Sequence, residues 1–159
     1  MKTPFVGSGS LVTLIVLGLA LAPSRPAEAQ EAIAVIVHPD NPLTTISRDE
    51  LRRFYLGTST TLPNRESVLL LESSTVRERF YATALGMSLD RVKRHWIGVV
   101  FSGQSGTPPK EVGGPDELRQ FVATHRGAIA FLAARDVSGS VKILALDGLR
   151  PSDPRYPLK

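Results

Sequence analysis

One short segment groups the residues whose chemistry is most informative, the stretch ESSTVRERF from Glu72 to Phe80. It follows the apolar run 68–71 and leads into a helical pattern. The first backbone N–H groups of a helix have no internal acceptors, and the helix dipole places partial positive charge there. Hydroxyl donors and two arginines beside such a terminus would bind an oxyanion. The candidate donors are Ser73, Ser74, Thr75 and Arg77, with Glu72 and Arg79 as secondary members.

The purely structural alternative for this segment is an ordinary helix cap with a solvated face. Glu72 complicates the binding interpretation, because a carboxylate beside the loop repels a dianion. It could pair with Arg77 or Arg79, or accept the proton of a monobasic oxyanion. A second glycine-rich loop, 102–109, could wrap an anion with the backbone near Gly106 and Thr107. It lacks the Gly-Lys-Ser/Thr ending of a nucleotide loop, and a plain connector is its alternative.

Residue types that carry other chemistry are missing or scattered. The chain has no cysteine, which excludes disulfides, thiol catalysis and a lipid-attachment cysteine. Its three histidines share no metal-ligand spacing, and no Gly-x-Ser-x-Gly elbow is present. Trp96, flanked at helical spacing by apolar residues, is expected in the core, with a protein contact surface as its alternative. The sequence therefore predicts no enzyme activity, no metal and no cofactor.

The N-terminal segment has the organisation of a secretory signal. Lys2 supplies a basic region, residues 11–22 are apolar, and Ala27-Glu28-Ala29 fits a cleavage site. We expect a signal peptide over residues 1–29, one domain over 30–149 and a flexible tail over 150–159. Without a lipobox or a later apolar span, the expected location is the periplasm, with no membrane span after cleavage. The net charge of +4 comes from interspersed charges, so no nucleic-acid partner is expected.

The elements that must position these residues alternate between strands and helices. Apolar β-branched runs predict strands, and a capping box at Ser47 with Glu50 opens the first helix. Gly57 and Gly86 are expected to close helices, and Ser88 and Pro115 to open them. Such alternation indicates an α/β domain with a mixed or mainly parallel sheet. The predicted strands are 32–37, 68–71, 128–132 and 141–146; the predicted helices are 48–55, 75–85, 89–101 and the one from 115 that Gly127 ends.

The order of these elements resembles that of periplasmic phosphate-binding proteins, the substrate-binding components of phosphate ABC transporters. Segment 33–57 is similar to the family's hinge strand, Asn-Pro loop and helix ending in Phe-Leu-Gly. Segment 72–80 resembles its Ser-Gly-Ser-Gly-Thr-Arg-Glu-x-Phe phosphate loop, and 125–131 echoes its Asn-Pro-Gly-Ala-Ile-Gly-Tyr. The resemblance implies one lobe of a type II periplasmic binding protein, with about 4–5 strands in a mixed, mainly parallel sheet flanked by helices.

Two departures from the family qualify what the resemblance implies. Family members clamp phosphate between two lobes, and this sequence matches only the second lobe. Aligned without gaps, the family's Gly falls on Thr75 and its ligand Thr on Val76, so Ser74 and Arg77 carry over and that Thr does not. The implied function is recognition of phosphate or a similar oxyanion, linked to phosphate ABC transport, with modest affinity unless a homodimer or another protein partner completes the site. The alternative is a non-catalytic interaction or sensor module that keeps the lobe as a scaffold.

Overall fold

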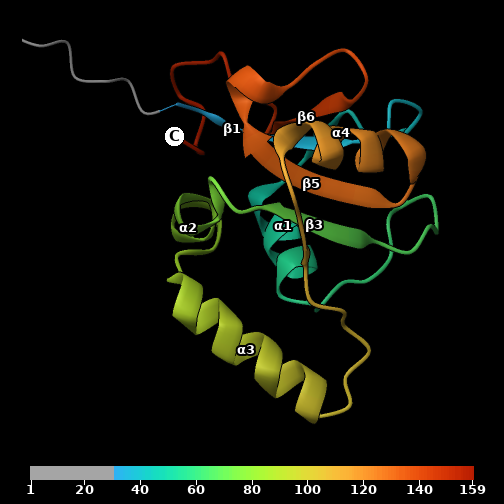
Figure 1. Ribbon diagram of the computed structural model, residues 1–159, viewed down its shortest axis with the longest axis vertical. Helices are drawn as coiled ribbons and strands as arrows, with labels where there is room; N and C mark the ends of the chain where they lie inside the picture. The colour runs from blue at the N-terminus through green and yellow to red at the C-terminus, as the bar shows by residue number, and fades with distance from the viewer. Residues whose placement is uncertain (1–30) are drawn as a thin grey trace, which may run out of the picture.

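The computed structural model describes residues 31–159, so the predicted signal peptide lies outside the described residues (Figure 1). Most predicted elements are confirmed. The strands are β1 (Ile33–Val37), β2 (Thr45–Ile46), β3 (Leu69–Ser73), β4 (Lys110–Val112), β5 (Ala128–Ala133) and β6 (Lys142–Leu146). The helices are α1 (Arg48–Tyr55), α2 (Arg77–Phe80), a π-helical turn (Tyr81–Leu85), α3 (Leu89–Phe101), α4 (Pro115–Thr124) and a 3-10 turn (Ala134–Asp136).

The sheet has six strands in the order β2-β6-β1-β5-β3-β4. Strand β1 runs antiparallel to both its neighbours, β5 and β6, and every other pair is parallel. The predicted mixed, mainly parallel sheet is therefore confirmed, with five strands in one direction and one against them. The two strands beyond the predicted set, β2 and β4, lie at the edges and have two and three residues. Such short edge strands pair through backbone groups and leave no apolar run in the sequence.

Helices cover both faces of the sheet, which explains why β1 is fully buried along its length. Odd-numbered residues of β1 pack with α1, the helical segment 77–85 and α3 in one core cluster. Even-numbered residues pack with α4 in a second cluster on the other face. Figure 1 shows α4 in front of the sheet and α1 behind it, so the lobe has three layers.

The helix ends follow the predicted capping chemistry. Ser47 and Glu50 form the capping box of α1, and the Ser88 side chain accepts from the Arg91 N–H at 3.4 Å. Gly86 adopts φ 67°, the left-handed conformation that closes the preceding helical segment. Within that segment the backbone changes from α to π geometry after Phe80, where the sequence predicted a continuous α-helix. α4 ends at Thr124, before the predicted Gly127.

The C-terminal residues pack against the core, so the prediction of a loosely ordered tail over 150–159 is wrong. Tyr156 and Leu158 are buried, and the Tyr156 hydroxyl donates to the carbonyl of Ile33 at 2.9 Å. The Ile33 N–H donates to the carbonyl of Leu158 at 2.8 Å. Two apolar side chains among prolines and charges do not stand out in the sequence, yet they cover the end of β1.

Gly127, from the segment that echoes the family motif, lies where β3 and β5 begin to pair. The Leu69 N–H donates to the Gly127 carbonyl at 2.9 Å, and a Cβ on Gly127 would overlap the backbone carbonyl oxygen of Ser67. We expect Gly127→Ala to lower the free energy of unfolding by about 1–3 kcal/mol, because the backbone must shift. Urea denaturation will measure it. The control is Gly139→Ala, where an added Cβ meets nothing within 4 Å; an equal loss in both variants would contradict the prediction.

Candidate functional site

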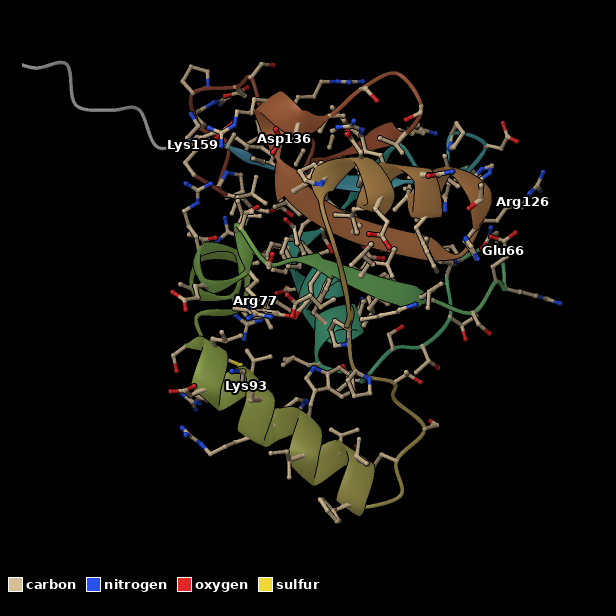
Figure 2. All side chains as sticks on the ribbon, in the orientation of Figure 1. Glu66, Arg77, Lys93, Arg126, Asp136 and Lys159 are labelled. Carbon is tan, nitrogen blue, oxygen red and sulfur yellow. The ribbon has the colours of Figure 1, made fainter. Side chains whose placement is uncertain are left out.

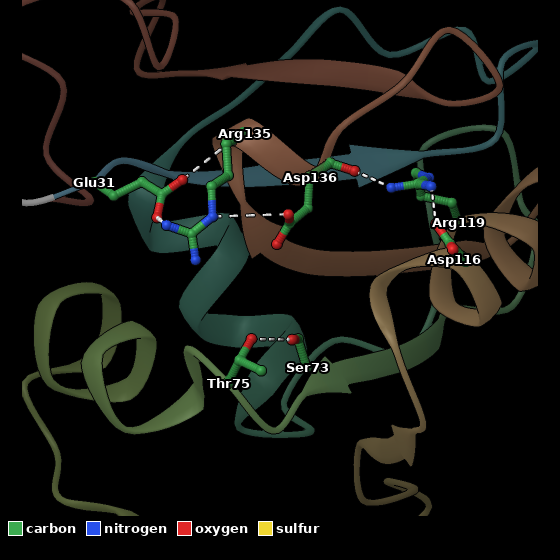
Figure 3. A network of polar contacts seen from close by, with 7 residues as sticks. All are labelled: Glu31, Ser73, Thr75, Asp116, Arg119, Arg135 and Asp136. Atoms are coloured by element: carbon green, nitrogen blue, oxygen red, sulfur yellow. Dashed lines mark hydrogen bonds and ion pairs between the residues drawn. The ribbon is translucent and has the colours of Figure 1, made fainter.

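The predicted oxyanion loop lies where β3 ends and α2 begins. β3 ends at Ser73, two residues beyond the predicted strand 68–71. Three turn residues follow, and α2 starts at Arg77, which Figure 2 labels, two residues later than the predicted start at 75. Ser73 is buried and its hydroxyl lies 2.9 Å from that of Thr75 (Figure 3). Ser74 and Thr75 are exposed to solvent. The loop therefore presents two of its three hydroxyl residues to solvent and uses the third to hold its own shape.

The N-terminus of α2 is not capped by a side chain. Val76 occupies the N-cap position and makes no side-chain hydrogen bond. Val76 is buried in the core cluster that contains Phe80. In the family that the sequence resembles, the aligned position holds a ligand Thr, whereas here its side chain belongs to the core. The Ser and Thr residues thus do not form an ordinary side-chain cap. The N–H groups of the first turn therefore have no intrahelical acceptor.

Arg77 is held between two carboxylates. Its guanidinium lies 2.6 Å from Glu111 and 3.3 Å from Glu72. Glu72 on β3 and Glu111 on β4 are directly paired in the parallel register, which brings both acids to one place. Burial works against the charged guanidinium, but the hydrogen bonds and charges of Glu111 and Glu72 outweigh it and raise the pKa of Arg77. The pairing of Glu72 with Arg77, one of the options left open by the sequence, is confirmed.

Tyr81 completes the polar network from one turn further along the helix. Its hydroxyl donates to the second oxygen of Glu72. Burial, and then the charge of Glu72, raise the pKa of Tyr81 well above its ordinary value, so the phenol stays protonated. Glu72 thereby receives one neutral and one charged donor, and its carboxylate is largely buried, with 12% of the side chain exposed.

The electrostatics of this network limit what the loop can hold. Arg77 contributes one positive charge against the two negative charges of Glu72 and Glu111. A dianion at the loop would meet a net negative group, whereas a monoanion is repelled less. Arg79, the other arginine of the loop, is half-buried and its Nε has no hydrogen-bond partner among the described residues.

The second predicted loop does not join this network. Gly106 lies against Gly57 and the ring of Trp96, where an added Cβ would come within 3.2 Å of the Trp96 ring. Thr107 lines a separate hollow of about 240 Å³ together with hydroxyl residues of the 59–67 loop. Gly106 therefore serves close packing, and an anion at Ser74 would not reach Thr107 in the same hollow.

An apolar groove beside the network was not anticipated. It has a volume of about 430 Å³ and runs between α3 and the segment that precedes β4. Trp96 is in the core as predicted, whereas Val100, four residues further along the helix, is exposed. The lining residues are Glu72, Tyr81, Leu89, Val92, Lys93, Trp96, Ile97, Val100, Phe101, Pro108 and Pro109. One feature of the sequence could have predicted the groove. Near the end of α3, apolar residues occupy three of every four consecutive positions, which is more than one buried face needs.

Comparisons with known proteins give a fold likeness without a sequence match. No protein-family model and no curated protein matches the sequence. An ABC-type phosphate transport receptor from Vibrio cholerae superposes with a TM-score of 0.63 at 18% identity, covering 77% of this chain and 48% of that one. A putative phosphate ABC transporter substrate-binding protein from Clostridium perfringens, solved with bound phosphate, gives 0.62 at 18%, covering 76% and 47%. PstS from Borrelia burgdorferi gives 0.63 at 12%, covering 80% and 54%.

The chain has the fold of one lobe of a phosphate-binding protein. It spans about half the length of the solved structures it matches. At these identities the likeness establishes the lobe fold alone. In this chain the loop between β3 and α2 contains a buried valine, and two acids surround the arginine that follows it. Within residues 31–159 no group of three or more His, Cys, Asp or Glu side chains is placed to hold a metal ion. In the same range no helix has the length and apolarity needed to cross a membrane.

Proposed function

We propose that this protein is an exported, non-enzymatic solute-binding lobe that recognises phosphate or a related oxyanion at the loop between β3 and α2. The observation that carries the proposal is the position of the exposed Ser74 and Thr75 at an uncapped helix start, with Arg77 in the first turn. The fold likeness to a protein solved with bound phosphate supports this ligand class. Export to the periplasm, and an association with phosphate ABC transport, belong to the same proposal.

The network around Arg77 implies weak binding and a preference for monoanions. The loop offers hydroxyl and backbone N–H donors to one side of the anion only. Each charge-assisted hydrogen bond that is missing on the other side forgoes about 1.5–3 kcal/mol of binding free energy. Glu72 and Glu111 compete with the ligand for Arg77. A monoanion such as dihydrogen phosphate can in addition donate a hydrogen bond to a carboxylate, which a sulfate dianion cannot do.

Anion titration of the purified protein tests this function. We expect calorimetry to show phosphate binding that strengthens as the pH falls toward the monoanion, with a weaker response to sulfate. Ser74→Ala and Arg77→Ala should each weaken phosphate binding by about three- to tenfold, because the first removes a hydroxyl donor and the second a positive charge with its N–H donors. The matched control is Ser138→Ala, an exposed hydroxyl remote from β3. Binding unchanged in both loop variants would reject the site.

A second function is favoured by the same ion pairs. Because Arg77 already has two carboxylate partners, the lobe can be a scaffold for a protein-interaction or sensor role without tight ligand binding. In that case no anion produces heat or a shift in melting temperature at any pH. The titration therefore separates the two functions directly.

A further inference from the structure

We propose that the protein forms a two-fold symmetric dimer through the C-terminal half of α3 and the groove beside it. This half of the helix has no polar face, because it contains Trp96, Ile97, Val99, Val100 and Phe101. A helix that is apolar all round is normally buried on all sides. Trp96 and Val99 are buried within the lobe, and the rest of the circumference has no cover among the described residues.

The uncovered residues form one continuous stripe. Ile97, Val100 and Phe101 are 56%, 55% and 86% exposed, and their spacing of three and four places them on one side of the helix. They are the large exposed hydrophobic residues of the part of the chain that the structure describes. Figure 1 shows α3, the helix that carries the stripe, extending away from the sheet. A contiguous apolar patch of this kind marks an interaction surface.

The exposed Phe101 side chain and the groove lie on the same surface, which is what a symmetric contact requires. Phe101 is 86% exposed and is one of the α3 residues that line the 430 Å³ groove, and Pro108 and Pro109 line it from the segment that precedes β4. In a two-fold contact the same patch meets itself, so each copy can place Phe101 against the groove of its partner. A partner of different sequence would need to supply both shapes, whereas a second copy already has them.

Charge along α3 favours an antiparallel pair. The N-terminal half carries the exposed residues Arg91, Lys93 and Arg94, which form no ion pair within residues 31–159. The last carbonyl groups of a helix carry partial negative charge. When two copies of α3 run in opposite directions, the basic half of each lies toward the negative end of the other.

Gly98 permits a close approach between the two helices. A glycine inside a helix lowers its stability relative to alanine, so its presence in mid-helix has a cost. An added Cβ at Gly98 would meet nothing within 4 Å, which shows that the glycine is not required by packing inside this lobe. It is exposed and lies three residues before Phe101, at the edge of the stripe, where it would let a second backbone come near.

Sedimentation velocity over a range of protein concentrations tests the dimer, without added anion. We expect a monomer–dimer equilibrium whose dissociation constant rises at least about tenfold in Phe101→Glu. The matched control is Gln120→Glu on α4, which adds the same charge at an exposed position and should leave the equilibrium unchanged. A purely monomeric protein at all concentrations, or equal weakening in both variants, would overturn the proposal.

Single-cysteine variants locate the contact, because the chain has no cysteine of its own. Under mild oxidation Val100→Cys should form a disulfide-linked dimer, and Gln120→Cys should stay monomeric. Two other occupants of the stripe have their own readouts. Sedimentation of the monomer with vesicles of anionic lipid would assign the stripe to a membrane, and binding of a fatty acid by the monomer would assign the groove to an apolar ligand. Either result, with no cross-linked Val100→Cys dimer, overturns the dimer.

Discussion

Replacing Phe131 with alanine is expected to lower the free energy of unfolding by about 3–5 kcal/mol, the largest loss of stability we foresee for one substitution. Phe131 on β5 is fully buried and stacks on Phe80 with ring centroids 3.7 Å apart. The rings of Tyr55 and Tyr81 lie within 6.0 Å of it as well. Removing the ring therefore leaves a cavity at the centre of an aromatic cluster that joins α1, the helical segment 77–85 and the sheet.

Urea denaturation of Phe131→Ala beside Phe121→Ala checks this expectation. Phe121 on α4 is half-buried, with its ring stacked on His125, so its loss should cost only about 1–2 kcal/mol. Since Phe80 ends α2, loosening the cluster should also destabilise the loop 74–76, which leads into α2 at Arg77. A Phe131→Ala protein as stable as Phe121→Ala would show that the cluster relaxes to fill the cavity.

The sequence carried enough information for the central elements and too little for the edges. β1, α1, α3 and β5 are long, periodic or capped, and their positions follow from local patterns. β2 and β4 were missed because two or three residues at a sheet edge pair by backbone alone. The burial of the tail was missed for a related reason, because it depends on two side chains and a hydrogen bond to β1.

The candidate site shows the same division between local and long-range information. The strand-to-helix loop could be predicted from the sequence. The Glu72–Arg77 pair could be predicted as well, because its two members are only five residues apart. Glu111 is 34 residues from Arg77 and reaches it only because β4 pairs with β3 in register. No local pattern predicts that pairing. The competing acid, which decides how strongly the loop can bind an anion, therefore emerges only from the assembled sheet.

Glu111 is consequently the residue through which anion affinity can be raised. We expect Glu111→Gln to strengthen phosphate binding by about five- to tenfold, because the amide no longer holds Arg77 by charge. Solvent screening limits the gain in affinity, since 51% of the Glu111 side chain and 24% of that of Arg77 are exposed. Glu72→Gln is less suitable, because its amide has one oxygen to accept from two donors, Arg77 and the buried Tyr81 hydroxyl, and this should lower stability.

Calorimetric titration of Glu111→Gln needs a control for its change in net charge. Asp116→Asn on α4 makes the same change at another arginine-paired carboxylate, that of Arg119. If release of Arg77 is the cause, phosphate affinity rises in Glu111→Gln alone, and the gain disappears when Arg77→Ala is added. An equal rise in both single variants would instead reflect net charge. If the phosphate affinity of Glu111→Gln does not rise, Arg77 does not contact the anion. Its ion pairs with the two glutamates then serve only to stabilise the sheet.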